Sequence, residues 1–181
     1  AGCFSFYPAK ILGGPGDGGA LITNNEEFYD WALKHRDHGR GEDNQIHHIG
    51  RNSRLDNLMA AFLNAQFIYF DNVINRRREV AKIYNDSLAK INQINLPLYE
   101  EKNINIKHFD TFQNYEILAD KRDELKKYLS ENGVGTLIQW GGITTNQILN
   151  YSANSKSSFS NTKSYYERCL MLPMNTIISD D

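Results

Sequence analysis

The sequence predicts an α/β fold, and three stretches of the chain support this prediction. Two short apolar segments, 2–7 and 19–23, flank a glycine-rich turn. A helical pattern then continues from about residue 54 to residue 92. A strand–helix–strand pattern follows over residues 111–140. Strands that alternate with helices in this way are typical of an α/β architecture.

The apolar segments 2–7 and 19–23 predict short buried strands, since each is bounded by turn residues. Five glycines between residues 13 and 19 predict a hairpin-like turn with positive φ at several positions. A phosphate-binding loop is a poorer interpretation, because the turn lacks the Gly-Lys-Ser/Thr ending and the spacing of a dinucleotide fingerprint.

A first helix is predicted over residues 26–35. Asn24 or Asn25 provides its N-cap, and acidic residues occupy its first turn. Residues 36–53 are polar and contain several glycines, and they form a long segment without a helical or strand pattern. Loops of this length inside a domain are usually functional or covered by a partner.

The helical stretch carries a wide apolar stripe and breaks near residues 70–72. Its apolar members are Leu55, Leu58, Ala61, Phe62, Ala65, Phe67 and Ile68. The basic run 76–78 predicts a solvated helix face, and Pro97 ends the helical region. The remaining pattern predicts a strand at 111–118, a helix at 121–132 ending at Gly133, a strand at 134–140, a helix at 162–169 and a short apolar segment at 171–173.

Composition excludes several classes of protein. The net charge of −2 over 181 residues gives no electrostatic case for nucleic acid or an anionic membrane as partner. No stretch has transmembrane length. Cys3 and Cys169 form no disulfide framework and lack metal-ligand spacing, which favours a cytoplasmic protein. His47 and His48 point in different directions and have no completing ligands, so we expect no metal and a loop that contacts substrate or partner.

The two ends of the sequence suggest an internal piece of a longer protein. The chain begins without methionine inside an apolar strand, and it stops at Asp180 and Asp181, which resemble the start of a helix. We therefore expect further residues on both sides.

Lys10 is the strongest candidate for a catalytic residue. It follows an apolar, aromatic strand and precedes the glycine turn, where the backbone can approach a ligand closely. A lysine with a lowered pKa can bond covalently to an aldehyde cofactor. The alternative is an exposed lysine after a strand, which is a common arrangement.

The surrounding residues resemble the lysine segment of the DegT/DnrJ/EryC1/StrS sugar aminotransferases. That segment reads Ser-Phe-x-Pro-x-Lys-x-Leu-Gly and then Gly-Asp-Gly-Gly-Ala; its counterparts here are Ser5, Phe6, Pro8, Lys10, Leu12, Gly13 and residues 16–20. A second signature comprises His38, Gly39, Gly50, Asn52, Arg54, Leu55, Asp56, Ala60 and Ala61. The sequence departs from the family pattern at Ile11, Arg51 and Met59, positions where the family commonly has asparagine, an aromatic residue and glutamine.

The resemblance implies a piece of a fold-type I enzyme that depends on pyridoxal 5′-phosphate. Residues 1–75 would be the C-terminal part of the large cofactor-binding domain, and residues 76–181 the small C-terminal α/β domain, joined by long helices. Lys10 would hold the cofactor and move protons, and Ser5 would bind its phosphate. Asn52 would reach the phosphate of the partner subunit's cofactor, which implies a homodimer. A sister branch that performs dehydration carries histidine in place of this lysine, so Lys10 favours transamination.

The implied reaction is amination of a nucleotide-linked keto-deoxysugar with glutamate as amino donor. The wording Gln-Trp-Gly-Gly at residues 139–142 suggests a dTDP-3-keto-6-deoxyhexose. Arg54, His47 and Trp140 are candidate substrate contacts. Arg54 can instead pair structurally near its helix start, Trp140 can be a core aromatic, and Ser5 can bond local backbone.

A different class of function is a non-catalytic subunit that only dimerises or binds a partner. The acid that pairs with the cofactor's ring nitrogen in the family, and the aromatic that stacks on its ring, would precede this sequence. The helix at 54–70 would then serve mainly to contact other chains.

Overall fold

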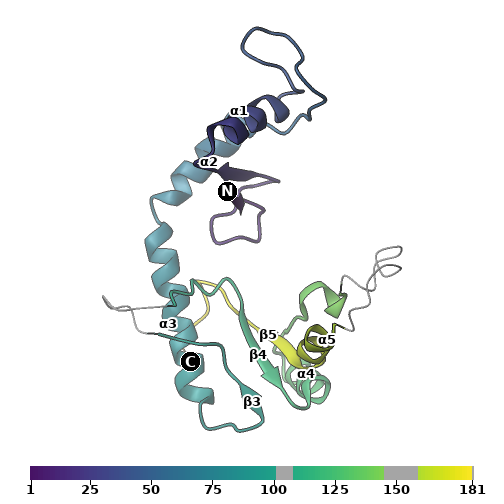
Figure 1. Ribbon diagram of the computed structural model, residues 1–181. Coiled ribbons are helices and arrows are strands. Elements are labelled where there is room, and N and C mark those ends of the chain that lie inside the picture. The colour runs from purple at the N-terminus through teal and green to yellow at the C-terminus, as the bar shows by residue number, and fades with distance from the viewer. Residues whose placement is uncertain (101–107, 145–158, 181) are drawn as a thin grey trace. The chain divides into compact units, whose positions relative to one another are not determined.

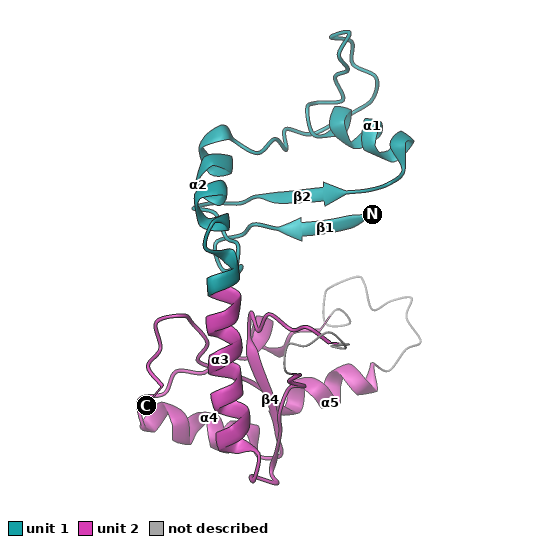
Figure 2. Ribbon diagram, turned by 90° about the vertical axis from the view of Figure 1, so that its left-hand side faces the viewer, with its two compact units in different colours: residues 1–72 teal, residues 73–181 magenta. Residues whose placement is uncertain are grey.

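The computed structural model describes residues 1–100, 108–144 and 159–180. The chain divides into two compact units, Ala1–Asn72 and Val73–Asp181, coloured separately in Figure 2. None of the helices in the described ranges combines the length and the apolar character that a membrane crossing requires.

The first unit contains a two-stranded antiparallel sheet and two helices (Figure 1). Strand β1 (Gly2–Ser5) pairs with β2 (Gly19–Ile22), so that Ser5 lies opposite Gly19. Most side chains of both strands are exposed, which contradicts the buried strands that the sequence predicts. Two strands by themselves cannot cover either face of their sheet.

Helix α1 (Glu26–His35) has the cap that the sequence predicts. Asn25 is extended, and its Oδ1 accepts a hydrogen bond of 2.7 Å from the Phe28 backbone N–H. Glu26 and Glu27 in the first turn, and Lys34 and His35 in the last, complement the helix dipole. Local sequence is therefore sufficient to start and end this helix.

The long helical stretch divides into α2 (Asn57–Phe67) and α3 (Phe70–Leu88). The break lies just ahead of the predicted position, and the helix ends well before Pro97. Leu63 is the one residue of α2 that is buried, and Leu58 stays 81 % exposed. Much of the predicted apolar stripe is therefore open on this unit.

The second unit is built on a three-stranded antiparallel sheet in the order β3-β4-β5. Its strands are β3 (Ile94–Asn95), β4 (Tyr115–Ala119) and β5 (Cys169–Leu172), accompanied by α4 (Arg122–Glu131) and α5 (Ser160–Arg168). The buried core consists of Ala81, Phe112, Tyr115, Ile117 and Leu170. The predicted helix 121–132 is confirmed, and Gly133 ends it with φ +80°.

The strand predicted at 134–140 is wrong. Leu137 makes one isolated bridge to Met171, and a short 3₁₀ turn, η1 (Gln139–Gly142), follows. Trp140 and Gly141 have φ of 51° and 62°, which no strand contains. The first residues of the strand predicted at 111–118 are also not a strand, because Phe112 has φ 50°.

The basic run at 76–78 is not a solvated helix face. Arg78 is only 5 % exposed, and its Nη1 donates to the Asp110 carbonyl at 2.7 Å while its Nη2 donates to the Glu100 carbonyl. Arg77 Nη1 donates to the carbonyls of Phe112 and Gln113, at 3.0 Å each. Segments more than twenty residues along the chain supply these acceptors, so the sequence pattern does not reveal them.

Candidate functional site

Lys10 lies in a turn that is tied directly to the end of β1. The Tyr7 backbone N–H donates to Ser5 Oγ at 3.2 Å, and the Lys10 N–H donates to the Tyr7 carbonyl at 2.8 Å. These two bonds link the serine and the lysine of the predicted cofactor site through a single intervening residue. The structure therefore brings Ser5 and Lys10 into one turn.

The glycines beside this turn are required for close packing rather than for positive φ. A Cβ on Gly13 would lie 2.7–2.9 Å from the carbonyl oxygens of Pro8, Tyr7 and Lys10. None of the glycines between residues 13 and 19 has positive φ, so the predicted left-handed turn is wrong. The glycines let the loop fold back on the carbonyls that shape the lysine turn.

The same loop packs against the start of α2. A Cβ on Gly14 would lie 2.6 Å from Met59 Cε, and one on Gly18 would lie 3.1 Å from Leu55 Cδ1. The lysine turn therefore rests on the segment that follows Asn52 in the chain. Among the described residues, no hydrogen bond joins Lys10 directly to Asn52.

Asn52 is presented by a short ladder between two segments of the 36–53 loop. It forms an isolated antiparallel bridge with Asp37. On either side, the His38 N–H donates to the Arg51 carbonyl at 2.9 Å, and the Ser53 N–H donates to the Arg36 carbonyl at 2.8 Å. The 36–53 loop thus contains two antiparallel segments joined by hydrogen bonds, and Asn52 is exposed on one of them.

Two glycines allow the segments of this loop to cross. A Cβ on Gly39 would lie 1.7 Å from the His48 carbonyl oxygen, and one on Gly50 would lie 2.1 Å from the Gly39 nitrogen. Gly39 also has φ +79°. This backbone contact gives a physical reason for the His-Gly…Gly-x-Asn spacing of the second signature.

We expect that Gly39→Ala destabilises the first unit by at least about 3 kcal/mol, since it adds a backbone clash to left-handed strain. Gly133→Ala is the matched control, because Gly133 has φ +80° and nothing lies within 4 Å of its Cβ position. That control should cost about 1–2 kcal/mol, from left-handed strain alone. Chemical denaturation of both variants measures the loss in free energy of unfolding. Equal losses would show that the close backbone contact at Gly39 is not what makes its substitution costly.

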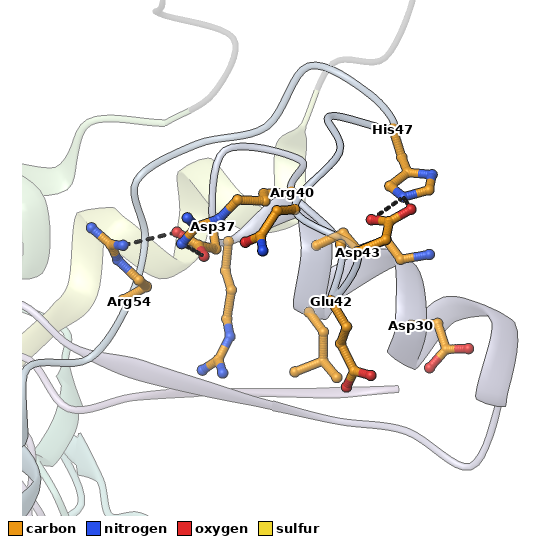
Figure 3. Close-up of a pocket in the computed structure, with 12 residues that line it drawn as sticks. Asp30, Asp37, Arg40, Glu42, Asp43, His47 and Arg54 are labelled. Carbon is orange, nitrogen blue, oxygen red and sulfur yellow. Dashed lines mark hydrogen bonds and ion pairs between the residues drawn. The ribbon is translucent and has the colours of Figure 1, made fainter.

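Two stacked histidines hold the far side of the loop against α1. The rings of Trp31 and His35 are 4.4 Å apart, and the His48 ring stacks 5.6 Å from Trp31 and 5.7 Å from His35. His47 does not join this stack. Its Nε2 lies 3.0 Å from Asp43 Oδ1 (Figure 3). His47 and His48, although adjacent in the sequence, therefore have separate structural roles.

A pocket of about 650 Å³ lies between α1 and this loop, and it includes two of the predicted substrate residues, His47 and Arg54. Asp37 also lines it, with Arg40 and Arg54 directed toward its carboxylate (Figure 3). Arg54 forms an ion pair with Asp37. Such a pair is what we expect if this arginine has a structural role near the start of its helix.

Trp140 belongs to the second unit and is 78 % exposed, so the core-packing alternative for it is wrong. Asp37 is the residue that the sequence argument missed. Asp37 lies three residues from Arg40, a spacing from which an ion pair could have been predicted. Its bond to Arg54 spans seventeen residues, and no sequence pattern predicts a pair at that distance.

The donors of the first unit suit a phosphorylated aldehyde. Among the described residues, no side chain pairs with the Lys10 amine, which is partly buried, or with the Asn52 amide. The Ser5 hydroxyl accepts one bond and retains its proton for donation. An amine, a hydroxyl and an amide are thus available for an aldehyde and a phosphate.

Comparison with known proteins decides the family. Residues 1–181 match the profile of the DegT/DnrJ/EryC1/StrS aminotransferase family. The chain belongs to this family. Enzymes of the family depend on pyridoxal 5′-phosphate.

Among its relatives is a UDP-2-acetamido-2-deoxy-3-oxo-D-glucuronate aminotransferase of Pseudomonas aeruginosa. It is 36 % identical over 140 residues, which cover 76 % of this chain and 37 % of the relative. A dTDP-3-amino-3,6-dideoxy-alpha-D-galactopyranose transaminase of Aneurinibacillus thermoaerophilus is 32 % identical over 97 % of this chain and 47 % of its own length.

The solved structure of Streptomyces venezuelae DesV superposes with a TM-score of 0.86 at 28 % identity, covering 98 % of this chain and 47 % of that one. The predicted fold class is therefore confirmed: the chain has the mixed α/β fold of part of a fold-type I aminotransferase. It spans less than half the length of the relatives that it matches.

Proposed function

We propose that this chain carries the lysine-bearing part of a pyridoxal-phosphate-dependent aminotransferase that aminates a nucleotide-linked keto-deoxysugar with glutamate as donor. The turn that ties Lys10 to Ser5 carries this proposal. Family membership supports the reaction class, and the hydrogen bonds that connect Ser5 and Lys10 through Tyr7 support the pairing of an amine with a phosphate donor.

Each donor has a distinct task in this proposal. Lys10 Nζ would hold the cofactor at its aldehyde group, and the same amine would take the proton from the substrate carbon as general base and deliver it to the cofactor's aldehyde carbon as general acid. Ser5 Oγ donates to the phosphate. When bound, pyridoxal phosphate supplies an electron sink for the negative charge that develops at the substrate carbon.

Asn52 donates its amide to the phosphate of the partner subunit's cofactor, so the proposed enzyme is a homodimer. Support for a partner comes from α2, where Leu58 and Phe62 share one face of the helix and are 81 % and 44 % exposed. Apolar side chains left open along one helix are typical of an interface. The Asn52 ladder immediately precedes this helix in the chain.

The proposed substrate is a dTDP-3-keto-6-deoxyhexose, in line with the dTDP-sugar transaminase among the relatives. Arg54 and His47, which line the loop pocket, are proposed to contact it, together with Trp140, whose ring is exposed. We further propose that residues 1–75 complete a larger cofactor-binding domain and that residues 76–181 form the small domain. A cytoplasmic location fits the two free thiols, Cys3 and Cys169.

Borohydride reduction of the full-length gene product with pyridoxal phosphate, followed by peptide mapping, tests the proposal. We expect a pyridoxyl group on Lys10 and none on Lys127, which is exposed on α4 and serves as an internal control. An unmodified Lys10 in folded protein would reject the proposal. The non-catalytic interaction subunit would then be the better assignment.

A further inference from the structure

Asp37 is placed where two arginines meet. It follows directly after Arg36, the C-cap of α1, and its carboxylate is shared between two guanidinium groups. Arg40 Nη2 donates to Asp37 Oδ2 at 2.8 Å, and Arg54 Nη1 donates to Asp37 Oδ1 at 2.8 Å (Figure 3). Each oxygen therefore holds one arginine.

The backbone of the same residue supports Asn52. Asp37 pairs with Asn52 in the antiparallel bridge, and Arg54 lies two residues beyond Asn52. The segment 51–54 is consequently fixed to Asp37 twice, once through its backbone and once through the Arg54 side chain. Among the described residues, Asp37 is the one side chain that pairs with both Arg40 and Arg54.

The charge of Asp37 is essential to this arrangement. The hydrogen bond from Arg40, with the nearby charge of Arg54, lowers the pKa of the Asp37 carboxyl below its ordinary value of 3.8. The carboxylate thus stays ionised at neutral pH, and the two pairs weaken only as the pH falls through that lowered pKa. A neutral amide offers one acceptor oxygen for two guanidinium groups, which would then repel each other.

We propose that Asp37 is a positioning residue that holds Asn52 in the orientation needed to donate to the cofactor phosphate. This inference rests on the role given to Asn52 in the proposed function. Asp37 itself makes no contact with the cofactor in this scheme. It acts through Arg54 and through the bridge.

The test compares the affinities of the full-length protein for pyridoxal 5′-phosphate and for pyridoxal, which lacks the phosphate. Asp37→Asn should raise the Kd for the phosphorylated form about tenfold, as expected when a charge-assisted hydrogen bond is misaligned. It should leave the Kd for pyridoxal unchanged. Added to Asn52→Ala, it should change neither value further.

Asp120→Asn is the matched control, because Asp120 also accepts from an arginine, Arg168 Nη2, at 2.8 Å, but lies in the second unit. It should leave both affinities unchanged. If Asp37→Asn raises both Kd values equally, Asp37 has only a structural role and the inference fails.

The inference and the proposed function can fail separately. If Asn52→Ala weakens binding of the phosphorylated form and Asp37→Asn does not, the positioning role is overturned and the role of Asn52 stands. If Asn52→Ala leaves that affinity unchanged, both assignments are overturned.

Discussion

Lys10→Ala is expected to abolish transamination. The variant loses both the covalent attachment of the cofactor and the amine that moves the substrate proton. General acid–base catalysis alone contributes about 10²- to 10⁴-fold, so the loss should be at least that large. The measurement is the rate at which glutamate converts the protein-bound cofactor to pyridoxamine phosphate, followed by absorbance.

Lys127→Ala is the control for this prediction, because the Lys127 side chain is 78 % exposed on α4 and pairs only weakly with Glu131, at 3.9 Å. It should retain the wild-type rate. Substantial glutamate turnover by Lys10→Ala would overturn the catalytic assignment. The proposal gives both the attachment of the cofactor and the transfer of the substrate proton to this one amine.

Arg78→Met is expected to destabilise the second unit by about 3 kcal/mol. The change removes two part-buried, charge-assisted hydrogen bonds, to the Asp110 and Glu100 carbonyls, which contribute about 1.5–3 kcal/mol each. It also removes a cation that lies 4.9 Å from the Tyr99 ring and 4.5 Å from the Phe109 ring, which contributes up to about 2 kcal/mol. Packing of the methionine side chain offsets part of this loss.

Urea denaturation of the full-length protein measures this effect. Arg78→Lys should lose less than Arg78→Met, because the ammonium keeps the charge over the rings but cannot reach both carbonyls as a fork. Lys127→Met, a similar change at an exposed site, should stay within about 0.5 kcal/mol of wild type. If all three variants have the same free energy of unfolding as wild type, the contacts of Arg78 do not stabilise the unit.

Local patterns predicted the elements whose ends depend on their own residues. Helix α1 begins at Glu26 because Asn25 caps it, and α4 ends before Gly133 because that residue takes positive φ. Elements that depend on distant partners were predicted less well. The strand expected at 134–140 is reduced to one bridge from Leu137 to Met171, and the left-handed residues from Trp140 onward end it.

The glycines illustrate the same limit. The sequence pointed to the turn between residues 13 and 19 and to the His38-Gly39 pair, but it gave the wrong reason for the first. Gly13 is required by contact with three carbonyl oxygens, and Gly39 by contact with His48. Such contacts depend on how segments meet, and a glycine count does not reveal which contact applies.

The sequence by itself determined the family and the α/β class, and it points to Lys10 and Ser5 as the proposed central pair, because these residues lie within one short motif. Only the tertiary structure decided that Arg78 is buried and that Asp37 joins Arg40 to Arg54. The acceptors of Arg78 lie 22 and 32 residues along the chain, and the bond between Asp37 and Arg54 spans 17 residues. A carboxylate or a carbonyl can satisfy an arginine from any position in the sequence, so the pairing becomes visible once the chain is folded.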